Sequence, residues 1–250
     1  LRHTLFPYTT LFRSTQEVHV THTLLLVVAG FTMVTGVLGA AAQNEFRRIL
    51  AFHIISQIGY IIMGLGIFTV TGVAGAIYFL VHNILSKTNL FLVSGVAYKL
   101  RGTYELKKLG GLYRDRPLLA TCFLVSAMSL AGLPPLSGFF GKFVLLVGGF
   151  EQGAYTIVAV SLVVSVLTLY SMTKIWAQAF WKDAPDAAAT PVAPPPRFEL
   201  GVMMVPVAIL AALIIVVGVG AEYFVGVSMR AAEELMNPGL YVRAVLGERT

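Results

Sequence analysis

The sequence predicts an all-α integral membrane protein with six helical crossings, one of them broken. Hydrophobic residues make up 57% of the chain and charged residues only 12%, whereas soluble domains carry about 25% charged residues. Several apolar runs reach the length of about 20 residues that a membrane crossing needs. One of these runs contains Pro134 and Pro135, and a helix cannot pass straight through consecutive prolines.

The crossings follow from the lengths of the apolar runs, because lipid-exposed backbone must satisfy its own hydrogen bonds. We expect crossings at residues 22–42, 49–68, 73–98, 118–150, 155–180 and 200–225. Turn signals separate them at 69–72 and 151–153, and the Ala/Pro-rich segment 183–197 is expected to be an extended loop. Residues 230–236 are expected to form a short surface helix.

The fourth segment contains the most informative motif of the chain, LAGLPPLSGFFGKF at residues 130–143. Pro134 and Pro135 break the helix, and Gly138 and Gly141 follow. Backbone groups freed at membrane depth are tolerated only where they are buried in protein or line a cavity. Lys142 follows the break, and an intramembrane lysine marks an ion or proton path because its insertion costs about 2.5–3.5 kcal/mol. Length favours one broken crossing over two, since each half would have only about 16 residues.

The basic residues predict the orientation of the chain in the membrane. With the fourth segment counted as one crossing, only Arg230, Arg243 and Arg249 lie on one side. Ten basic residues share the other side: Arg47, Arg48, Lys99, Arg101, Lys107, Lys108, Arg114, Arg116, Lys182 and Arg197. The positive-inside rule makes this side cytoplasmic. We therefore expect a multi-pass protein of the cell inner (plasma) membrane, with loops 43–48, 99–116 and 181–199 in the cytoplasm. This placement explains the net charge of +6 without nucleic-acid binding.

Lys87 is the second candidate proton carrier, near the middle of the segment 73–98. Asn83 lies one turn before it on the same helix face, and Ser94 continues that face. A lysine there could be a protonatable group in the bundle interior or a structural lysine bonded to carbonyls of a neighbouring helix; we favour the first role. Lys142 has two interpretations as well, a gated carrier beside unwound backbone or a snorkelling lysine near an interface, and the carrier is favoured.

Other polar side chains inside the segments have two roles open to them. His82 aligns with Tyr78 and Ser86, and it fits a hydrogen-bonded core residue and a proton relay equally well. A stripe on the segment 49–68 could hold water or join helices, and we favour joining; it consists of His53, Ser56, Gln57 and Tyr60. We expect packing roles for Ser161, Ser165 and Thr168, snorkelling for Lys174 and an interfacial position for Glu222.

The first residues of the chain are expected to be foreign to it. Residues 4–14 read TLFPYTTLFRS, and all eleven match a frame translation of a common sequencing-library adapter. We therefore expect residues 1–14 to be an assembly artefact, and the native protein to extend further toward its N-terminus. The predicted organisation is a transmembrane domain at 15–226 followed by a tail at 227–250.

Four motifs in order carry a family resemblance: NEFRRILAFHIISQIGYI, HNILSKTNLFLVSG, ELKKLGGLY and SLAGLPPLSGFFGKF. Together they resemble the antiporter-like membrane subunits, which include the D and A subunits of Mrp-type multisubunit cation/proton antiporters and the pumping subunits of respiratory complex I. The wording FHIISQIGY and SKTNLFLVSG is most similar to the D subunits. The resemblance covers residues 20–180.

The resemblance implies a fourteen-helix subunit with two inverted repeats, of which this chain is the six-helix C-terminal part: the second repeat and the final helix. It implies that Lys87 is the family's central lysine, that Lys142 is the lysine of the broken helix and that His82 is the histidine preceding the central lysine. A glutamate–lysine pair of the first repeat should lie upstream.

Three functions remain open. The first is a proton-translocating subunit of a multisubunit Na⁺ or K⁺/H⁺ antiporter, with other subunits, the lipid bilayer, protons and the cation as partners. The second is a proton-pumping subunit of complex I or a membrane hydrogenase, and the third is a non-translocating scaffold, which the intramembrane lysines disfavour. The chain has no nucleotide fingerprint and no cysteine cluster, so we expect a transporter subunit without a cofactor or metal, and not an enzyme.

Overall fold

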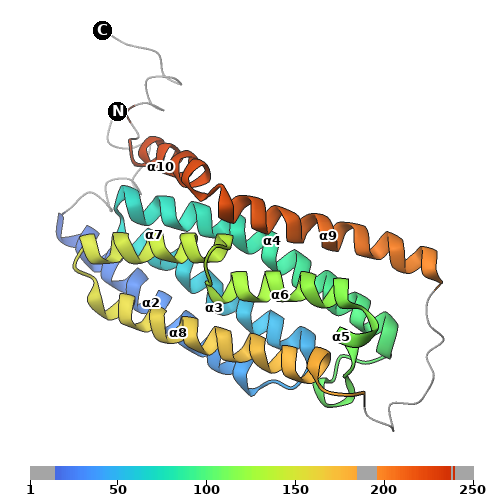
Figure 1. Cartoon of the computed structure of the whole chain (residues 1–250). Coiled ribbons are helices and arrows are strands. Elements are labelled where there is room, and N and C mark those ends of the chain that lie inside the picture. Colours follow the sequence, from blue (N-terminus) through green and yellow to red (C-terminus); the bar gives the residue numbers. More distant parts are fainter. Residues whose placement is uncertain (1–14, 185–195, 238, 240–250) are drawn as a thin grey trace, which may run out of the picture.

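The computed structural model describes residues 15–184, 196–237 and 239, and these residues form a bundle of long helices (Figure 1). The main helices are α2 (Thr15–Ala42), α3 (Phe46–Ile67), α4 (Val70–Arg101), α6 (Pro117–Ala131), α7 (Ser137–Glu151), α8 (Tyr155–Ile175), α9 (Arg197–Val219) and α10 (Ala221–Met236). Short elements are η1 (Leu106–Lys108), α5 (Leu112–Asp115) and η2 (Trp176–Trp181), a π-helical turn that continues α8. Five of the described helices are long and apolar enough to cross a membrane. The predicted all-α membrane fold is confirmed, while residues 1–14 lie outside the described part.

The fourth expected crossing is formed by α6 and α7, which follow one another along the bundle in the same direction (Figure 1). Gly132 ends α6 with a φ of 94°, a left-handed conformation that glycine adopts without steric strain. Pro134 and Pro135 then separate the two halves. Helix α9 packs closely on this break, since a Cβ added at Gly218 would lie 2.5 Å from the Pro135 carbonyl oxygen. The expected broken helix is therefore confirmed, and its two halves run in one direction, as a single crossing requires.

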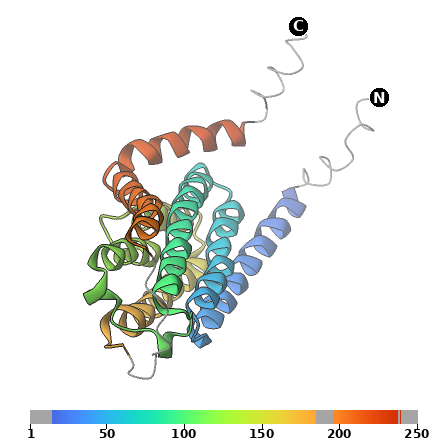
Figure 2. The same cartoon turned by 90° about the vertical axis from the view of Figure 1, so that its right-hand side faces the viewer.

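The last expected crossing, 200–225, is wrong at its C-terminal end. Helix α9 ends at Val219, and α10 starts at Ala221 and runs off at an angle across the end of the bundle (Figure 2). The apolar sequence continues past this turn, so hydropathy alone could not locate it. Glu222 accordingly lies in the first turn of α10, where an acidic side chain suits the helix dipole. The expected surface helix at 230–236 is the second half of α10.

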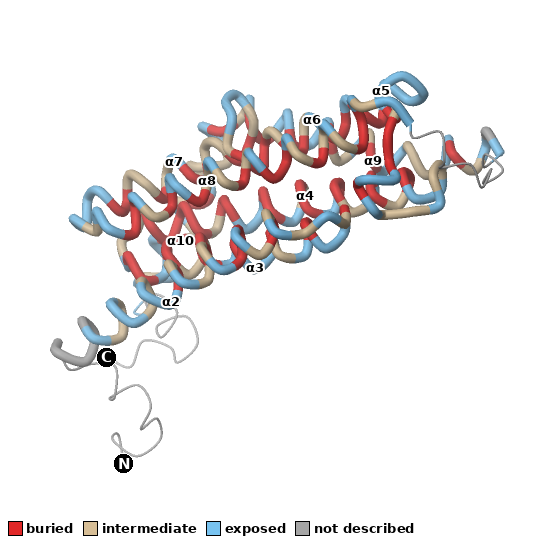
Figure 3. Tube along the Cα trace, turned by 90° about the horizontal axis from the view of Figure 1, so that it is seen from below, coloured by how far each residue is buried: buried red, intermediate tan, exposed pale blue. Residues whose placement is uncertain are grey.

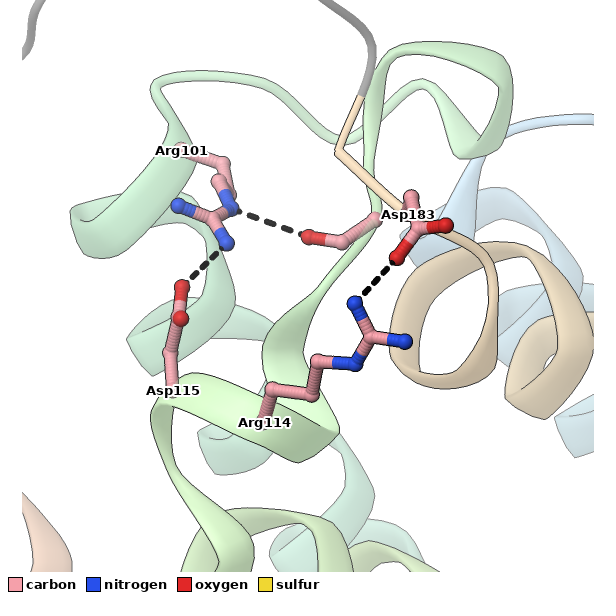
Figure 4. Close-up of polar contacts among 5 residues, drawn as sticks. Arg101, Arg114, Asp115 and Asp183 are labelled. Atoms are coloured by element: carbon pink, nitrogen blue, oxygen red, sulfur yellow. Dashed lines mark hydrogen bonds and ion pairs between the residues drawn. The ribbon is translucent and has the colours of Figure 1, made fainter.

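The described parts of the three loops predicted to share one side of the membrane, residues 43–48, 99–116 and 181–184, lie together at one end of the bundle. Most of the expected extended loop 183–197 lies outside the described residues. Backbone hydrogen bonds join Phe46 N–H to the Tyr104 carbonyl at 2.9 Å and Gly111 N–H to the Lys182 carbonyl at 2.7 Å. Figure 4 shows two ion pairs of this end, Arg101 with Asp115 and Arg114 with Asp183. The Arg114–Asp183 pair is exposed and therefore contributes little to stability.

A polar layer separates two apolar clusters inside the bundle. The cluster nearer the loop end contains Phe46 and Leu50 of α3 with Leu90 and Val93 of α4. The other contains Tyr60 and Met63 of α3 with Ala76 and Phe79 of α4, together with residues of α2 and α8. Most buried polar residues of both helices lie between these positions in sequence: His53, Ser56, Gln57, His82, Asn83, Ser86, Lys87 and Asn89. Figure 3 shows that buried positions follow the inward faces of the helices.

Candidate functional site

Lys142 lies just beyond the helix break and points back across it. Its Nζ donates a hydrogen bond to the Ala131 carbonyl at 3.0 Å, and Ala131 is the last residue of α6. The same ammonium lies over the ring of Tyr60, 5.1 Å from the ring centroid, within the range of a cation–π interaction. Lys142 is only 6% exposed, so the snorkelling interpretation is wrong: its partners are a helix terminus and an aromatic ring inside the bundle.

His82 connects α4 to both sides of the break through serine hydroxyls. Its Nδ1 lies 2.8 Å from Ser137 Oγ and 3.2 Å from Ser86 Oγ. Ser137 Oγ is in turn 3.2 Å from Ser129 Oγ on α6. The ring approaches α7 so closely that a Cβ at Gly138 would lie 2.8 Å from His82 Nε2. His82 is therefore hydrogen-bonded on one ring nitrogen, while its buried Nε2 has no protein partner in the described structure.

Lys87 points from α4 toward α3. Its Nζ lies 3.4 Å from the Leu50 carbonyl oxygen, and the side chain is 8% exposed. Among the described residues, no carboxylate forms an ion pair with Lys87 or with Lys142. Both lysines are thus held by backbone oxygens and not by counter-charges.

One face of α3 links the two lysines. Leu50, the partner of Lys87, and Tyr60, the partner of Lys142, are separated on this face by His53 and Gln57. The ten-residue spacing corresponds to about 15 Å along a helix. His53 and Gln57 are buried, and none of their side-chain nitrogen and oxygen atoms has a protein partner in the described structure. Buried polar groups are usually satisfied by protein or by ordered water, so the unpartnered atoms of His53 and Gln57 are candidate water-binding groups.

His53 and Gln57 do not fit the preferred helix-joining role in the α3 stripe, because neither side chain has a hydrogen-bond partner among the described residues. That role holds for the other two members of the stripe. Ser56 Oγ donates to the Met33 carbonyl of α2 at 3.0 Å. Tyr60 Oη lies 2.8 Å from Ser165 Oγ and donates to the Ser161 carbonyl of α8. Spacing could place all four on one helix, but it could not tell which of them meet a partner.

A groove of about 220 Å³ reaches this region from the outer face of α3 and α4. Gln57, Asn83 and Lys87 form its polar part, and isoleucine and leucine side chains form the rest. Asn83 bonds through Nδ2 to the Phe79 carbonyl at 2.9 Å, while its Oδ1 lacks a partner in the described structure. The expected common face of Asn83 and Lys87 is confirmed by their position in one groove.

Two predictions concern residues away from the break. Lys174, expected to snorkel, reaches the loop end of the bundle, where its Nζ bonds to the carbonyls of Ala41 at 3.1 Å and Gln43 at 2.7 Å. The reason is that a helix C-terminus leaves carbonyls unsatisfied, and lysine can cap those of α2. The packing role of the α8 hydroxyls is confirmed, since each bonds to a carbonyl of its own helix: Ser161, Ser165 and Thr168.

Sequence reasoning missed Ser129 and Ser137, which bring both halves of the broken crossing to His82. They lie on either side of the break in the quoted motif, and that symmetry was the available signal. It also missed a buried pair on the α4–α6 contact, in which Asn89 Nδ2 donates to Ser126 Oγ at 2.7 Å. Single serines and asparagines in apolar helices are common packing residues, so their composition alone does not reveal a site.

Comparisons with known proteins agree with this architecture. Residues 5–168 match the family described as NADH:quinone oxidoreductase/Mrp antiporter, TM. The chain is 46% identical over 228 residues to the D subunit of the Na(+)/H(+) antiporter of Alkalihalophilus pseudofirmus, and 40% identical over 228 residues to the protein of that name in Bacillus subtilis. Each alignment covers 91% of this chain and 45% of the relative, so the chain spans less than half the length of these relatives.

Chains of two solved complexes are similar to this chain in structure. The Mrp complex from Dietzia sp. contains a chain that superposes with a TM-score of 0.81 and 34% identity, covering 90% of this chain and 49% of that one. A chain of respiratory complex I from Thermus thermophilus superposes with a TM-score of 0.72 and 27% identity, covering 88% and 46%. The broken crossing, the two buried lysines and the match over more than half of the sequence lead to one conclusion: this chain belongs to the NADH:quinone oxidoreductase/Mrp antiporter transmembrane family.

Proposed function

We propose that this chain forms the second half of the D subunit of a multisubunit cation/proton antiporter, which exchanges Na⁺ or K⁺ for protons. Its similarity to two proteins named as the D subunit of an Na(+)/H(+) antiporter supports this assignment. In this role the chain is a transporter subunit and not an enzyme, and it works with the other subunits of the complex in the plasma membrane. The loop end of the bundle faces the cytoplasm, as its basic residues predict.

The observation that carries the proposal is the α3 face between Lys87 and Lys142. Each lysine is buried without a counter-charge, and an amine in that position binds and releases a proton. His53 and Gln57 lie between them and bind water through their unpartnered atoms. A proton therefore moves between the lysines along water held by α3. His82 forms a side branch of this proton route. Its hydrogen bond to Ser137 makes its position depend on the geometry of the break.

The groove beside Lys87 supplies the entry to this route. Gln57, Asn83 and Lys87 line it on the outer face of α3 and α4. The family resemblance implies a glutamate–lysine pair in the upstream half of the full-length protein. That half delivers protons to this groove. Lys142, next to the unwound backbone, then passes them on as the break opens.

A proton-pumping subunit of a redox-driven complex is the second candidate, favoured by the structural similarity to complex I from Thermus thermophilus. The proton chemistry would be the same, and only the driving partner would differ. Affinity purification of the full-length subunit separates the two. Small antiporter subunits should co-purify under the first assignment, and flavin or iron–sulfur subunits under the second.

The test of the proton route uses everted vesicles that contain the full-length subunit in its assembled complex. Lys87→Ala should abolish proton-coupled exchange of Na⁺ or K⁺ without preventing membrane insertion, because it removes a buried charge. Lys87→Arg should also fail, since arginine does not deprotonate in proteins. The matched control is Lys99→Ala on the same helix, because Lys99 is exposed and pairs only with exposed Glu199 at 3.0 Å.

Assembly of each variant is checked by immunoblot of the purified complex. Exchange at the wild-type rate in an assembled Lys87→Ala complex would show that Lys87 is structural and would favour the scaffold function. Loss of exchange in Lys99→Ala as well would show that the assay reports general damage to α4.

A further inference from the structure

A cavity of about 520 Å³ opens at the loop end of the bundle, remote from the two buried lysines. It lies where the C-terminal part of α4 meets the first turns of α6 and α9. Its walls are mainly apolar: Val96, Pro117, Leu118, Leu119, Leu200 and Met204. The described span of α9 begins at Phe198, so the cavity lies at the level where membrane interior gives way to headgroups.

The aromatic residues of the same end support this level. Tyr98, Tyr113 and Trp181 are all exposed there, and tyrosine and tryptophan concentrate at membrane–water interfaces. An exposed apolar cavity at this depth is therefore open to lipid as well as to water.

Charge at the mouth of the cavity is positive once the neighbouring ion pairs are counted. Asp115 lines the cavity but is paired with Arg101 (Figure 4). Glu199 is close to the cavity wall in sequence and is paired with Lys99 at 3.0 Å. Arg116 also lines the cavity, and its side chain has no ion-pair or hydrogen-bond partner among the described residues. One uncompensated guanidinium thus stands at the rim of an apolar cavity.

Gly201 keeps the cavity open from the α9 side. It lines the cavity, and a Cβ added there would meet no atom within 4 Å. A glycine inside a helix is less stable than alanine, and here no close contact within the chain requires it. The free space over Gly201 is therefore available to another molecule.

We propose that this cavity binds an anionic phospholipid, with the lipid phosphate at Arg116 and an acyl chain along Leu119, Gly201 and Met204. The combination fits because basic pockets between membrane helices on the cytoplasmic side bind anionic headgroups, and guanidinium groups recognise phosphate strongly. The occupant is a lipid because the apolar walls continue into the membrane level of α4, α6 and α9. The inference requires membrane insertion and does not depend on proton transport.

The experiment uses the full-length subunit in its assembled complex, purified in non-ionic detergent and supplied with mixed micelles. Phosphatidylglycerol and phosphatidylcholine with identical acyl chains are compared, and native mass spectrometry counts the retained lipid. The wild-type complex should retain phosphatidylglycerol in preference to phosphatidylcholine. Arg116→Gln should weaken the apparent affinity about fivefold, as expected for one basic group at an anionic lipid, and Arg116→Lys should restore most of it.

Gly201→Leu tests the acyl-chain site without changing charge. Its side chain should fill the cavity and remove one retained phosphatidylglycerol. Gly226→Leu is the matched control, because a Cβ at Gly226 also meets no atom within 4 Å but Gly226 does not line this cavity. That variant should bind lipid like the wild type.

Three outcomes would overturn the proposal. Unchanged lipid retention in both Arg116→Gln and Gly201→Leu would show that the cavity is not a lipid site. A rise in melting temperature with inorganic phosphate equal to that with phosphatidylglycerol would identify a phosphate site. Loss of complex assembly in Gly201→Leu, with assembly intact in Gly226→Leu, would identify a neighbouring protein of the complex as the occupant.

Discussion

Lys142 bonds across the helix break to the main-chain carbonyl of Ala131, with its Nζ 3.0 Å from the carbonyl oxygen. The carbonyls at the end of a helix lack intrahelical partners and carry its negative dipole. The ammonium of α7 therefore stabilises the end of α6, and this contact ties the two halves together. Loss of the charge of Lys142 would weaken that tie, so in the proposed function proton binding at Lys142 is linked to the geometry of the break.

Gly132→Ala should weaken this link. Gly132 has a φ of 94°, and an added Cβ would lie 3.0 Å from Lys142 Cδ. The left-handed backbone would cost about 1–2 kcal/mol for alanine, and Lys142 would be pushed from the Ala131 carbonyl. We expect a lower melting temperature of the assembled complex and slower antiport in everted vesicles. Gly226→Ala, with open space around it, should change neither. Normal melting and normal antiport in Gly132→Ala would contradict the proposed tie.

Ser137→Ala should remove the hydrogen bond that joins His82 to the C-terminal side of the break. It removes the hydroxyl 2.8 Å from His82 Nδ1, and the loss of one hydrogen bond costs about 1 kcal/mol. We expect reduced antiport in addition to a small loss of thermal stability. Ser228→Ala is the control, since among the described residues Ser228 Oγ donates only to the Phe224 carbonyl of its own helix, at 3.0 Å. If both variants transport equally well at equal complex levels, His82 acts without Ser137.

The sequence could predict the break, Lys87 and Lys142 because each is an outlier in an apolar run. Prolines and lysines at membrane depth require an explanation whatever their neighbours are. The partners of these residues could not be predicted in the same way. Ala131 supplies only a backbone oxygen, Tyr60 supplies a ring face, and the hydroxyls of Ser129 and Ser137 meet only because of the way the chain crosses the break.

The boundaries of the last crossing show a second limit of sequence reasoning. Residues 221–225 are mostly apolar, and Gly220 alone marks the turn between α9 and α10. The turn is defined by packing of α10 on α4, where Met229 and Ala232 contact the cluster around Val73 and Ala74. Such a tertiary contact overrides local hydropathy and leaves no periodic signal within one segment.

Cysteine labelling should place the loop end in the cytoplasm. Lys107 is exposed in the loop after α4, and Gln152 is exposed at the opposite end of the bundle. In intact cells an impermeant thiol reagent should label Gln152→Cys and leave Lys107→Cys unmodified. The native Cys122 is buried and should give little background. Labelling of Lys107→Cys from outside, with Gln152→Cys protected, would invert the orientation deduced from the basic residues.

Gln57→Leu should slow transport without lowering the thermal stability of the complex. The Gln57 amide is buried and neither its nitrogen nor its oxygen has a protein partner among the described residues. Replacing a buried, unpartnered polar group by an apolar one of similar size is neutral or stabilising for a folded protein. In the proposed proton route, the same change removes a water-binding group from the α3 face between Lys87 and Lys142. We therefore expect an unchanged or higher melting temperature of the assembled complex, together with slower proton-coupled exchange.

The comparison variant is Ser56→Ala, on the same helix one residue before Gln57. Ser56 Oγ donates to the Met33 carbonyl at 3.0 Å, so its removal should lower stability by about 1 kcal/mol and leave the water-binding face of α3 intact. Gln57→Leu should thus slow exchange without lowering the melting temperature, whereas Ser56→Ala should lower the melting temperature without slowing exchange. A Gln57→Leu complex that exchanges cations for protons at the wild-type rate would exclude Gln57 from the route. A Gln57→Leu complex that melts well below the wild type would show instead that its amide has a structural partner in the full-length protein.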